Sequence, residues 1–252
     1  MEYDKLLNLG SELGRLLMNS GAEIYRVEES VTRLLTAYGL DPQVFAIPNC
    51  LIVSIDTPEG KPLTRMCRIG AHGTDIELLE HCNDLCRKLC AHPIAVDDAL
   101  AQLEQLPRKS RTFSPKIVLL GHLLAGSFFA AFFGGTLRDF FCAALTGLAV
   151  GCCTVYGQPF IGSNSFFRTV VCSAVAAALP MLMVALGLGD NQDLITIGVL
   201  MLLVPGMALT NAMREIMAGD IISGVNRTAE VLLIGTAIAL GTAIPLVIAQ
   251  LA

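Results

Sequence analysis

The chain has 252 residues, a net charge of −5 and apolar residues at 54% of its positions. The negative net charge and the absence of a basic tract exclude the electrostatic surface on which nucleic-acid binding depends, so we expect no nucleic-acid partner. Of the 39 Asp, Glu, Lys and Arg residues, 29 lie before residue 117, which indicates a soluble first part and an apolar second part.

The first part predicts a cytoplasmic α+β domain over residues 1–106. Leucines at helical spacing open the chain, and short β-branched runs separated by Pro, Asn and Gly follow them. The expected elements are two helices, three strands and two helices, at 4–18, 22–38, 44–47, 50–55, 63–69, 74–90 and 96–105. The order ααβββαα is typical of a small α+β domain in which helices cover one face of an antiparallel sheet.

The densest polar cluster of this domain lies at the start of the second predicted helix. Glu23, Arg26 and Glu28 fall there within one turn and a half. Two interpretations stay open: a solvated helix start whose acids favour the positive end of the helix dipole, or an interdomain or ligand-sensing contact. The domain shows no nucleophile elbow, P-loop or HExxH motif, so we expect neither an enzyme activity nor a cofactor.

Three cysteines recur every four residues at Cys82, Cys86 and Cys90. At a rise of 1.5 Å per residue the outer two lie about 12 Å apart along the helix, too far to share one metal ion. The spacing therefore predicts a buried apolar stripe, and we expect no metal site.

The second part predicts an all-α membrane domain of five transmembrane helices over residues 117–252, after a basic linker at 107–116. Five apolar stretches without a charged residue approach the length of about 20 residues that a spanning helix needs. Backbone polar groups in hydrocarbon must be satisfied within the segment, so each stretch is expected to be helical. The expected spans are 117–135, 138–156, 168–188, 194–213 and 229–251.

The basic residues of the linker, Lys109 and Arg111 among them, predict that the end before the first span is cytoplasmic. Five crossings then place the amino terminus in the cytoplasm and the carboxyl terminus outside. The first 20 residues contain no continuous apolar run, so we expect no signal peptide. His122, inside the first predicted span, is either an interhelical hydrogen bonder or a proton-relay candidate.

The most unusual segment follows the fourth stretch, where Pro205-Gly206 interrupts an apolar run. A Pro-Gly pair opens a helix and frees backbone carbonyls, and broken membrane helices are tolerated where they line a cavity. The polar residues beyond the break are substrate-binding candidates, together with the pair itself: Pro205, Gly206, Thr210, Asn211, Arg214, Glu215, Asp220 and Arg227. The alternative is an ordinary kink followed by an amphipathic helix that lies on the lipid surface.

Three stretches carry a family resemblance: GAEIYRVEESVTRLL at 21–35, TDIELLE at 74–80, and LMLLVPGMALTNAMREIMAGDIISGVNRTAEVLL at 200–233. In these the chain resembles the ThrE-type threonine/serine exporter family over nearly its whole length. Long members of that family look like a cytoplasmic domain followed by about ten spans. The five expected here are similar to the YjjP-like half of the split, two-subunit form.

The resemblance implies a subunit of a secondary-active exporter in the bacterial cell inner membrane, so the carboxyl terminus that the charge pattern places outside is expected to be periplasmic. It implies a succinate-like dicarboxylate, or threonine and serine, as substrate, and a second small multi-spanning membrane subunit of the same family as partner. Five helices enclose little room for a gated pathway, so we expect that partner or a homo-oligomer. A membrane-anchored enzyme and a ligand sensor that uses the 1–106 domain are the alternatives.

Overall fold

The computed structural model describes residues 2–57, 60–70, 73–109, 113–157, 159 and 164–251. The chain folds into two compact units. The first, here called the α+β unit, consists of the chain up to residue 112 together with residues 210–227. The second, the helical unit, consists of residues 113–209 and the chain from residue 228 onward.

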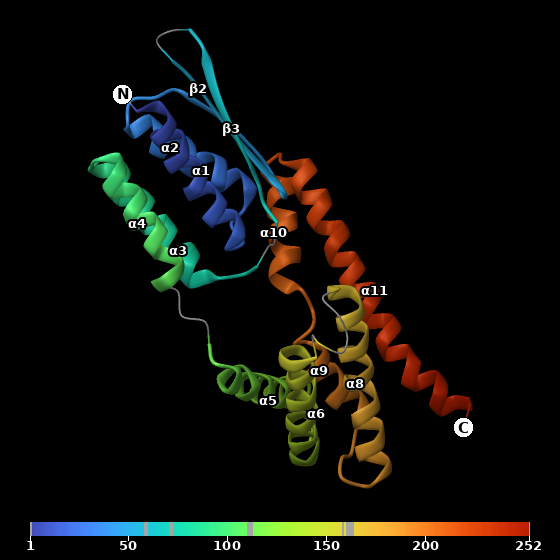
Figure 1. The fold of residues 1–252 in the computed structure, drawn as a ribbon. Coiled ribbons are helices and arrows are strands. Elements are labelled where there is room, and N and C mark those ends of the chain that lie inside the picture. The colour runs from blue at the N-terminus through green and yellow to red at the C-terminus, as the bar shows by residue number, and fades with distance from the viewer. Residues whose placement is uncertain are drawn as a thin grey trace. The chain divides into compact units, whose positions relative to one another are not determined.

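The α+β unit has the predicted order of two helices, three strands and two helices. These elements are α1 (Tyr3–Asn19), α2 (Ile24–Ala37), β1 (Pro42–Ile47), β2 (Cys50–Asp56), β3 (Pro62–Arg68), α3 (Ile76–Ala91) and α4 (Val96–Lys109) (Figure 1). The last of them continues through Pro107 into the region expected to be a linker. Arg111, which belongs to the predicted basic cluster, lies outside the described residues.

The core of this unit forms where α1 and α2 pack against the central strand. Leu9 and Leu13 of α1 are almost completely buried, and the alternating residues Leu51 and Val53 of β2 face them. Each fully buried leucine contributes about 1.5–3 kcal/mol of hydrophobic stabilisation. A Cβ atom on Gly14 would collide with the Leu51 side chain, so the glycine permits the close approach of α1 to the sheet.

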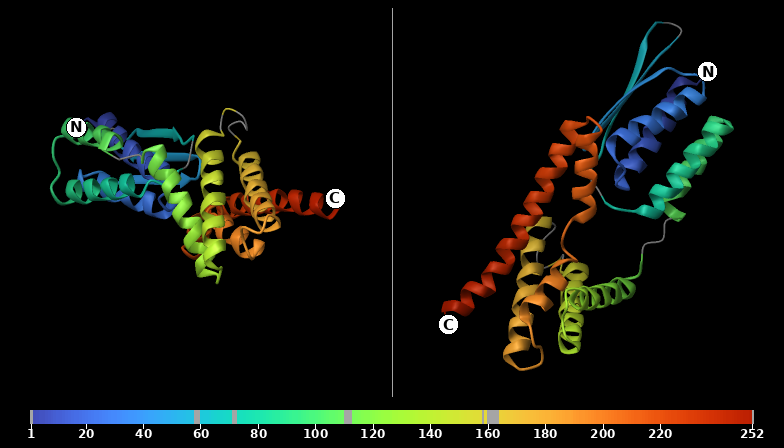
Figure 2. Two further views of the ribbon diagram at one scale, coloured as in Figure 1. Left: turned by 90° about the horizontal axis from the view of Figure 1, so that it is seen from below. Right: turned by 180° about the vertical axis from the view of Figure 1, so that it is seen from behind.

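The three strands form an antiparallel sheet in the order β1-β2-β3 (Figure 2). Phe45 is paired with Ile52, and Ile52 with Met66, so these three residues form one row across the sheet. Phe45 and Met66 are exposed, whereas the neighbouring residues of β2 are buried. This alternation shows that the helices cover a single face of the sheet, as the α+β order predicts.

The cysteine stripe lies on the inner face of α3. Cys82 and Cys86 are buried in the core of the α+β unit, and Cys90 packs against that core while partly exposed. The four-residue spacing therefore marks an apolar helix face, as predicted.

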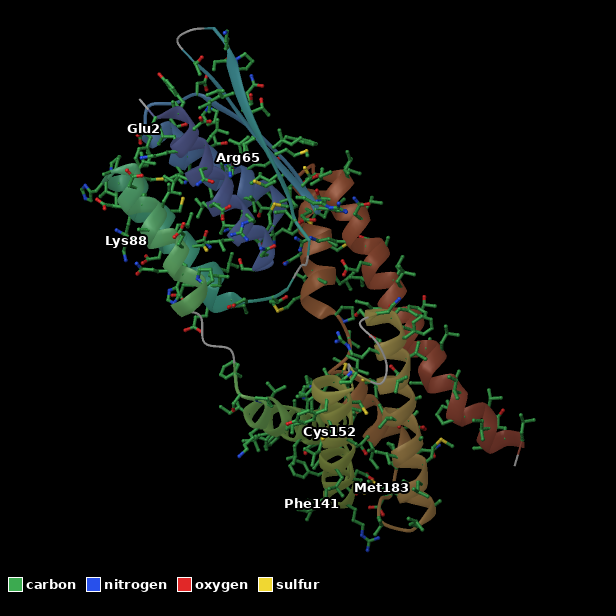
Figure 3. All side chains as sticks on the ribbon, viewed as in Figure 1. Glu2, Arg65, Lys88, Phe141, Cys152 and Met183 are labelled. Atoms are coloured by element: carbon green, nitrogen blue, oxygen red, sulfur yellow. The ribbon has the colours of Figure 1, made fainter. Side chains whose placement is uncertain are left out.

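The helical unit contains α5 (Pro115–Phe132), α6 (Leu137–Tyr156), α8 (Ser165–Ala185), α9 (Gln192–Leu200) and the part of α11 (Ile221–Leu251) that begins at residue 228. Among the described residues, four helices are long and apolar enough to cross a membrane: α5, α6, α8 and α11. Their outward-facing residues are large and apolar, as Phe128, Phe141 (labelled in Figure 3) and Leu182 illustrate, which suits a lipid environment.

The expected fourth span, 194–213, is not one continuous helix. Its apolar residues are divided between α9, which has 9 residues, and α10 (Gly206–Met217). At 1.5 Å per residue α9 is about 14 Å long, roughly half of the hydrocarbon thickness. Sequence hydropathy does not detect such a division, because the residues on both sides of the break are equally apolar.

Small residues let α5 and α6 approach closely. A Cβ atom on Gly147 would lie 2.5 Å from the carbonyl oxygen of His122, and one on Gly151 would lie 2.9 Å from the His122 Cβ. Gly126 of α5 lies opposite Gly147 in the same contact. This is the small-xxx-small packing that brings membrane helices together without a hydrophobic driving force between them.

Candidate functional site

The fourth apolar stretch is interrupted where the sequence carries Pro205-Gly206. α9 ends at Leu200, and α10 begins at Gly206. Proline has no N–H to donate and disfavours the helical conformation at the residue before it, which accounts for the interruption. A Cβ atom on Gly206 would have open space around it, so the break depends on the proline and not on a close contact at the glycine.

A second break, at Gly219, separates α10 from α11. Gly219 has a φ of +93°, and the N–H of Asp220 donates to the carbonyl oxygen of Glu215 at 3.0 Å. A glycine in the left-handed region commonly ends a helix in this way. Asp220 then accepts a hydrogen bond from the N–H of Ser223 at 3.3 Å and caps α11. Residues 210–227 therefore form a helical hairpin, here called the hairpin segment.

Glu215 is at the centre of the contact between the hairpin segment and α2. Its side chain is fully buried, and its Oε1 lies 3.2 Å from the Nε of Arg227. The same oxygen accepts a hydrogen bond of 3.3 Å from the N–H of Ile24. Ile24 is the first residue of α2, and the N-cap residue Glu23 makes no side-chain cap. Glu215 therefore supplies an acceptor for the start of α2, from 191 residues away.

Two arginines complete this contact. Arg214 pairs with Glu23, and Arg227 donates to the carbonyl oxygen of Ala22 at 2.9 Å. The Glu23 carboxylate also lies 3.6 Å from the Nε of Arg26, so an arginine of α2 and an arginine of α10 share it. The Glu23 side chain is 11% exposed and that of Arg214 is 50% exposed. The acid is therefore held inside the contact while much of the Arg214 guanidinium still faces outward.

Burial raises the pKa of Glu215 above its ordinary value. The Arg227 guanidinium and the Ile24 N–H lower it in part, and the nearby carboxylates Asp220 and Glu23 raise it further. The second carboxylate oxygen, Oε2, has no hydrogen-bond partner among the described residues. A buried carboxylate with one unsatisfied oxygen binds a proton more readily than a glutamate in water.

The structure thus brings two predicted clusters together. Glu23 and Arg26, expected in an interdomain or ligand-sensing contact, meet Arg214, expected to bind substrate. Glu215 and Arg227, two further binding candidates, are the buried pair of the same contact. The geometry is established, whereas the assigned roles in binding remain predictions.

The remaining candidates lie apart from this ion-pair network. Thr210 is exposed and Asn211 is partly buried, and both belong to the part of α10 that opens the hairpin segment. Glu28 accepts a hydrogen bond of 2.7 Å from the N–H of Ala46, so it ties α2 to β1. Burial raises the pKa of Glu28 as well.

His122, the proton-relay candidate, lies on α5 in the helical unit. Its Nδ1 is 2.9 Å from the carbonyl oxygen of Val118, four residues earlier in the same helix. This bond stays within α5, so it is not the interhelical hydrogen bond that the sequence suggested, and both interpretations of His122 stay predictions.

Sequence reasoning missed Asp139, which connects two turns of the helical unit. The carboxylate is fully buried and accepts hydrogen bonds from the N–H groups of Asp190 and Asn191, at 2.8 and 2.9 Å, and from that of Thr136, at 3.0 Å. It joins the α5–α6 turn to the α8–α9 turn. The T-x-x-D spacing of Thr136 and Asp139 is a capping-box signal that could have marked it.

Among the residues that the structure describes, no three His, Cys, Asp or Glu side chains are arranged to hold a metal ion. Several apolar helices of spanning length, together with a folded α+β unit that contains its own core, define a multi-pass membrane protein with an extramembrane domain.

The chain belongs to the ThrE family, whose model is described as "Putative threonine/serine exporter" and matches residues 8–249. The family resemblance of the three sequence stretches is therefore confirmed. No solved structure matches the chain.

Among the similar proteins are two named as exporters. The chain is 23% identical to a "Probable threonine/serine exporter" of Mycobacterium tuberculosis, over 96% of the chain and 46% of that protein. It is 21% identical to a "Threonine/serine exporter" of Corynebacterium glutamicum, over 98% of the chain and 52% of that protein. Neither name is that of an enzyme, in agreement with the prediction of a transport protein.

A third relative is the "Pheromone-regulated membrane protein 10" of Debaryomyces hansenii, which is 28% identical over 83% of the chain and 21% of that protein. The chain thus spans between about a fifth and about half of the length of these three relatives.

Proposed function

We propose that this chain is a subunit of a secondary-active exporter that carries small carboxylate metabolites out of the cell across the bacterial inner membrane. Its family membership and the exporter names of two relatives support the proposal. Threonine and serine, or a succinate-like dicarboxylate, are the substrate classes. The sequence contains no P-loop, which favours an ion gradient over ATP as the energy source.

The observation that carries the proposal is the break at Pro205-Gly206 followed by the charged hairpin segment. Secondary transporters bind their substrates at discontinuous helices, where freed backbone groups and helix ends meet the ligand. We assign α9 and the first residues of α10 to one broken crossing, with Thr210 and Asn211 directly beyond the break. The half-exposed Arg214 guanidinium presents further N–H donors, and arginine binds carboxylates through two parallel hydrogen bonds.

The orientation follows if the segment from α9 to the start of α10 crosses the membrane. Four long helices and one broken crossing place the amino terminus in the cytoplasm and the carboxyl terminus in the periplasm. Reporter fusions at Ala252 and in the turn near Asp190 should then be active only in the periplasm. A carboxyl-terminal reporter that is active only in the cytoplasm would mean that this segment does not cross.

A second small multi-spanning subunit of the same family, or a further copy of this chain, completes the pathway in this proposal. The relatives named as exporters are about twice as long as the region that they share with the chain. Transport pathways are generally built from two repeats around a central site, and the helical unit provides one such set of helices.

The test is metabolite efflux from cells that lack the chain. Loss of threonine or succinate efflux, with recovery only when the chain and its partner are both expressed, is the expected result. Full transport by the purified chain alone in liposomes would show that a second subunit is not required. Efflux of both metabolites at the parental rate in the deletion strain would contradict the proposed transport function itself.

A further inference from the structure

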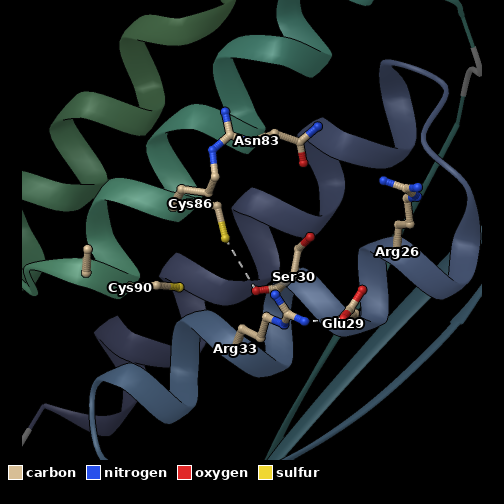
Figure 4. Close-up of a pocket in the computed structure, with 9 residues that line it drawn as sticks. Arg26, Glu29, Ser30, Arg33, Asn83, Cys86 and Cys90 are labelled. Atoms are coloured by element: carbon tan, nitrogen blue, oxygen red, sulfur yellow. Dashed lines mark hydrogen bonds and ion pairs between the residues drawn. The ribbon is translucent and has the colours of Figure 1, made fainter.

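A cavity of 500 Å³ lies between α2 and α3 in the α+β unit, well apart in sequence from the hairpin segment. Figure 4 shows the residues that line it, with α2 on one side and α3 on the other. The polar lining residues are Arg26, Glu29, Ser30, Arg33, Asn83 and Arg87. A volume of this size falls within the range of roughly 300–1,000 Å³ that small-molecule sites occupy.

The cavity is positively charged although the chain carries a net charge of −5. Three arginines line it and Glu29 is the one acid among the lining residues, so the lining carries a net charge of +2. The thiol of Cys86 is also part of the lining and donates to the carbonyl oxygen of Ser30 at 3.6 Å. Burial raises the pKa of Cys86 to about 12, so this thiol stays neutral and does not repel an anion.

The present partners of these arginines are easily exchanged. Arg33 pairs with Glu29 at 2.5 Å and Arg87 with Asp84 at 3.3 Å, and all four side chains are about half exposed or more. Exposed pairs of this kind contribute little to stability, because water competes for both partners. Each guanidinium has five N–H donors, most of which remain available to a ligand carboxylate.

Arg26 connects the cavity to the hairpin segment. It lines the cavity, and its Nε lies 3.6 Å from the Glu23 carboxylate that also pairs with Arg214. An anion bound at Arg26 would compete with the Glu23 carboxylate for this guanidinium, whose Nε–H donates to the Tyr25 hydroxyl at 3.2 Å. Glu23 is then left with Arg214 as its cationic partner, and the contact between α2 and the hairpin segment tightens.

We propose that the α2–α3 cavity is a regulatory site for a small dicarboxylate, and that the occupied site strengthens the hold of α2 on the hairpin segment through Arg26 and Glu23. A dicarboxylate fits because guanidinium groups from two helices can meet its two ends, whereas a single phosphate fills little of the cavity. A zwitterionic amino acid would place its ammonium group among arginines. Binding is independent of the proposed export function, and only the effect on export rests on it.

The binding test is titration calorimetry on the purified full chain, with succinate, threonine and inorganic phosphate as separate probes. Succinate is expected to bind at least about 10-fold more tightly than the other two. It can accept charge-assisted hydrogen bonds at both of its ends, and each such additional bond raises the affinity by about 10-fold or more. The double variant Arg33→Gln/Arg87→Gln should weaken succinate binding by about 10- to 100-fold. The matched control Arg65→Gln/Arg68→Gln removes two exposed charges from β3 and should leave binding unchanged.

The double variant also separates this cavity from the candidate transport site, because Arg33 and Arg87 line the cavity and neither belongs to the hairpin segment. Unchanged binding in Arg33→Gln/Arg87→Gln, or equal affinity for all three probes, would overturn the site. For the coupling, hydrogen exchange at residues 213–218 should slow on addition of succinate in the natural chain, but not in Arg26→Gln. Succinate that binds without slowing this exchange would overturn the link to the hairpin segment.

Discussion

Arg214 pairs with Glu23, and in the proposed function it also offers donors to a substrate carboxylate. A charge-assisted hydrogen bond contributes about 1.5–3 kcal/mol, so its loss corresponds to roughly a 10- to 150-fold change in affinity. We expect Arg214→Ala to raise the half-saturation concentration for efflux by that factor. Glu23→Gln should raise it less, because the arginine remains.

Efflux kinetics with membrane abundance measured in parallel would check this prediction, with Arg65→Ala on exposed β3 as the control. If Arg214→Ala is present at normal abundance and its half-saturation concentration is unchanged, the hairpin segment does not bind the substrate. Equal defects in Arg214→Ala and Glu23→Gln would assign Arg214 to docking alone.

Glu215 predicts a pH dependence of the same contact. Its pKa in the docked hairpin is raised above the ordinary 4.5 by burial. The docked state therefore binds the proton more tightly than the undocked state. Docking is most stable below the ordinary pKa and weakens as the pH rises through the raised value. Arg227, Asp220, Glu23 and the Ile24 N–H face this carboxylate.

Hydrogen-exchange protection at residues 213–218 should consequently be greater at mildly acidic than at mildly alkaline pH, after correction for intrinsic rates. Glu215→Gln should reduce this dependence, because the amide oxygen still accepts from Ile24 but does not titrate. Asp98→Asn is the matched control, since it replaces an exposed acid of α4 by its amide. An unaltered pH dependence in Glu215→Gln would locate the titrating group elsewhere.

The sequence identified most members of this contact but not their partners. Arg214, Glu215 and Arg227 stand out because charges are rare near apolar stretches, and Glu23 stands out because it belongs to the densest polar cluster of the first part. Their pairing depends on tertiary structure across 191 residues, for which local spacing contains no signal. The role of Glu215 as a cap for α2 is hidden for the same reason, since a capping acid is normally sought beside the helix that it caps.

At the scale of elements, helical periodicity and β-branched runs were sufficient for the α+β order, because each element has an apolar face of its own. The four long membrane helices were predictable from charge-free length. The division between α9 and α10 was only half predicted: Pro205-Gly206 marked the break, but hydropathy joined the two sides into one span. Asp139 was overlooked because an acid in a turn is usually solvated.

Asp139 is expected to be essential for the connection between the α5–α6 and α8–α9 turns. Asp139→Ala leaves three backbone N–H groups without their acceptor, so we expect the free energy of unfolding to fall by at least about 2 kcal/mol. Thermal unfolding in detergent would measure it. Asp193→Ala, an exposed acid in the first turn of α9, should cost no more than about 1 kcal/mol. Similar shifts for both variants would contradict the structural role of Asp139.

At the scale of the whole molecule, the α+β unit contains residues from two distant parts of the chain, but its hydrophobic core does not. Every residue of the buried core cluster lies between Leu6 and Leu106. We therefore expect residues 1–106 to fold when expressed alone, with cooperative thermal unfolding monitored by circular dichroism. Gly14→Leu, which would force a side chain into Leu51, should abolish that transition. A fragment 1–106 that is insoluble or lacks cooperative unfolding would show that the hairpin segment is needed for the fold.

The capping of α2 by Glu215 also has a consequence for the order of events on the ribosome. Translation at roughly 5–20 residues per second separates the synthesis of Ile24 from that of Glu215 by about 10–40 s. During that interval the first turn of α2 lacks its distant acceptor, while α5, α6 and α8 emerge for insertion. The cap closes only after these helices and α10 have been made. A nascent chain that stalls before residue 215 therefore leaves the Ile24 N–H at the start of α2 without this acceptor.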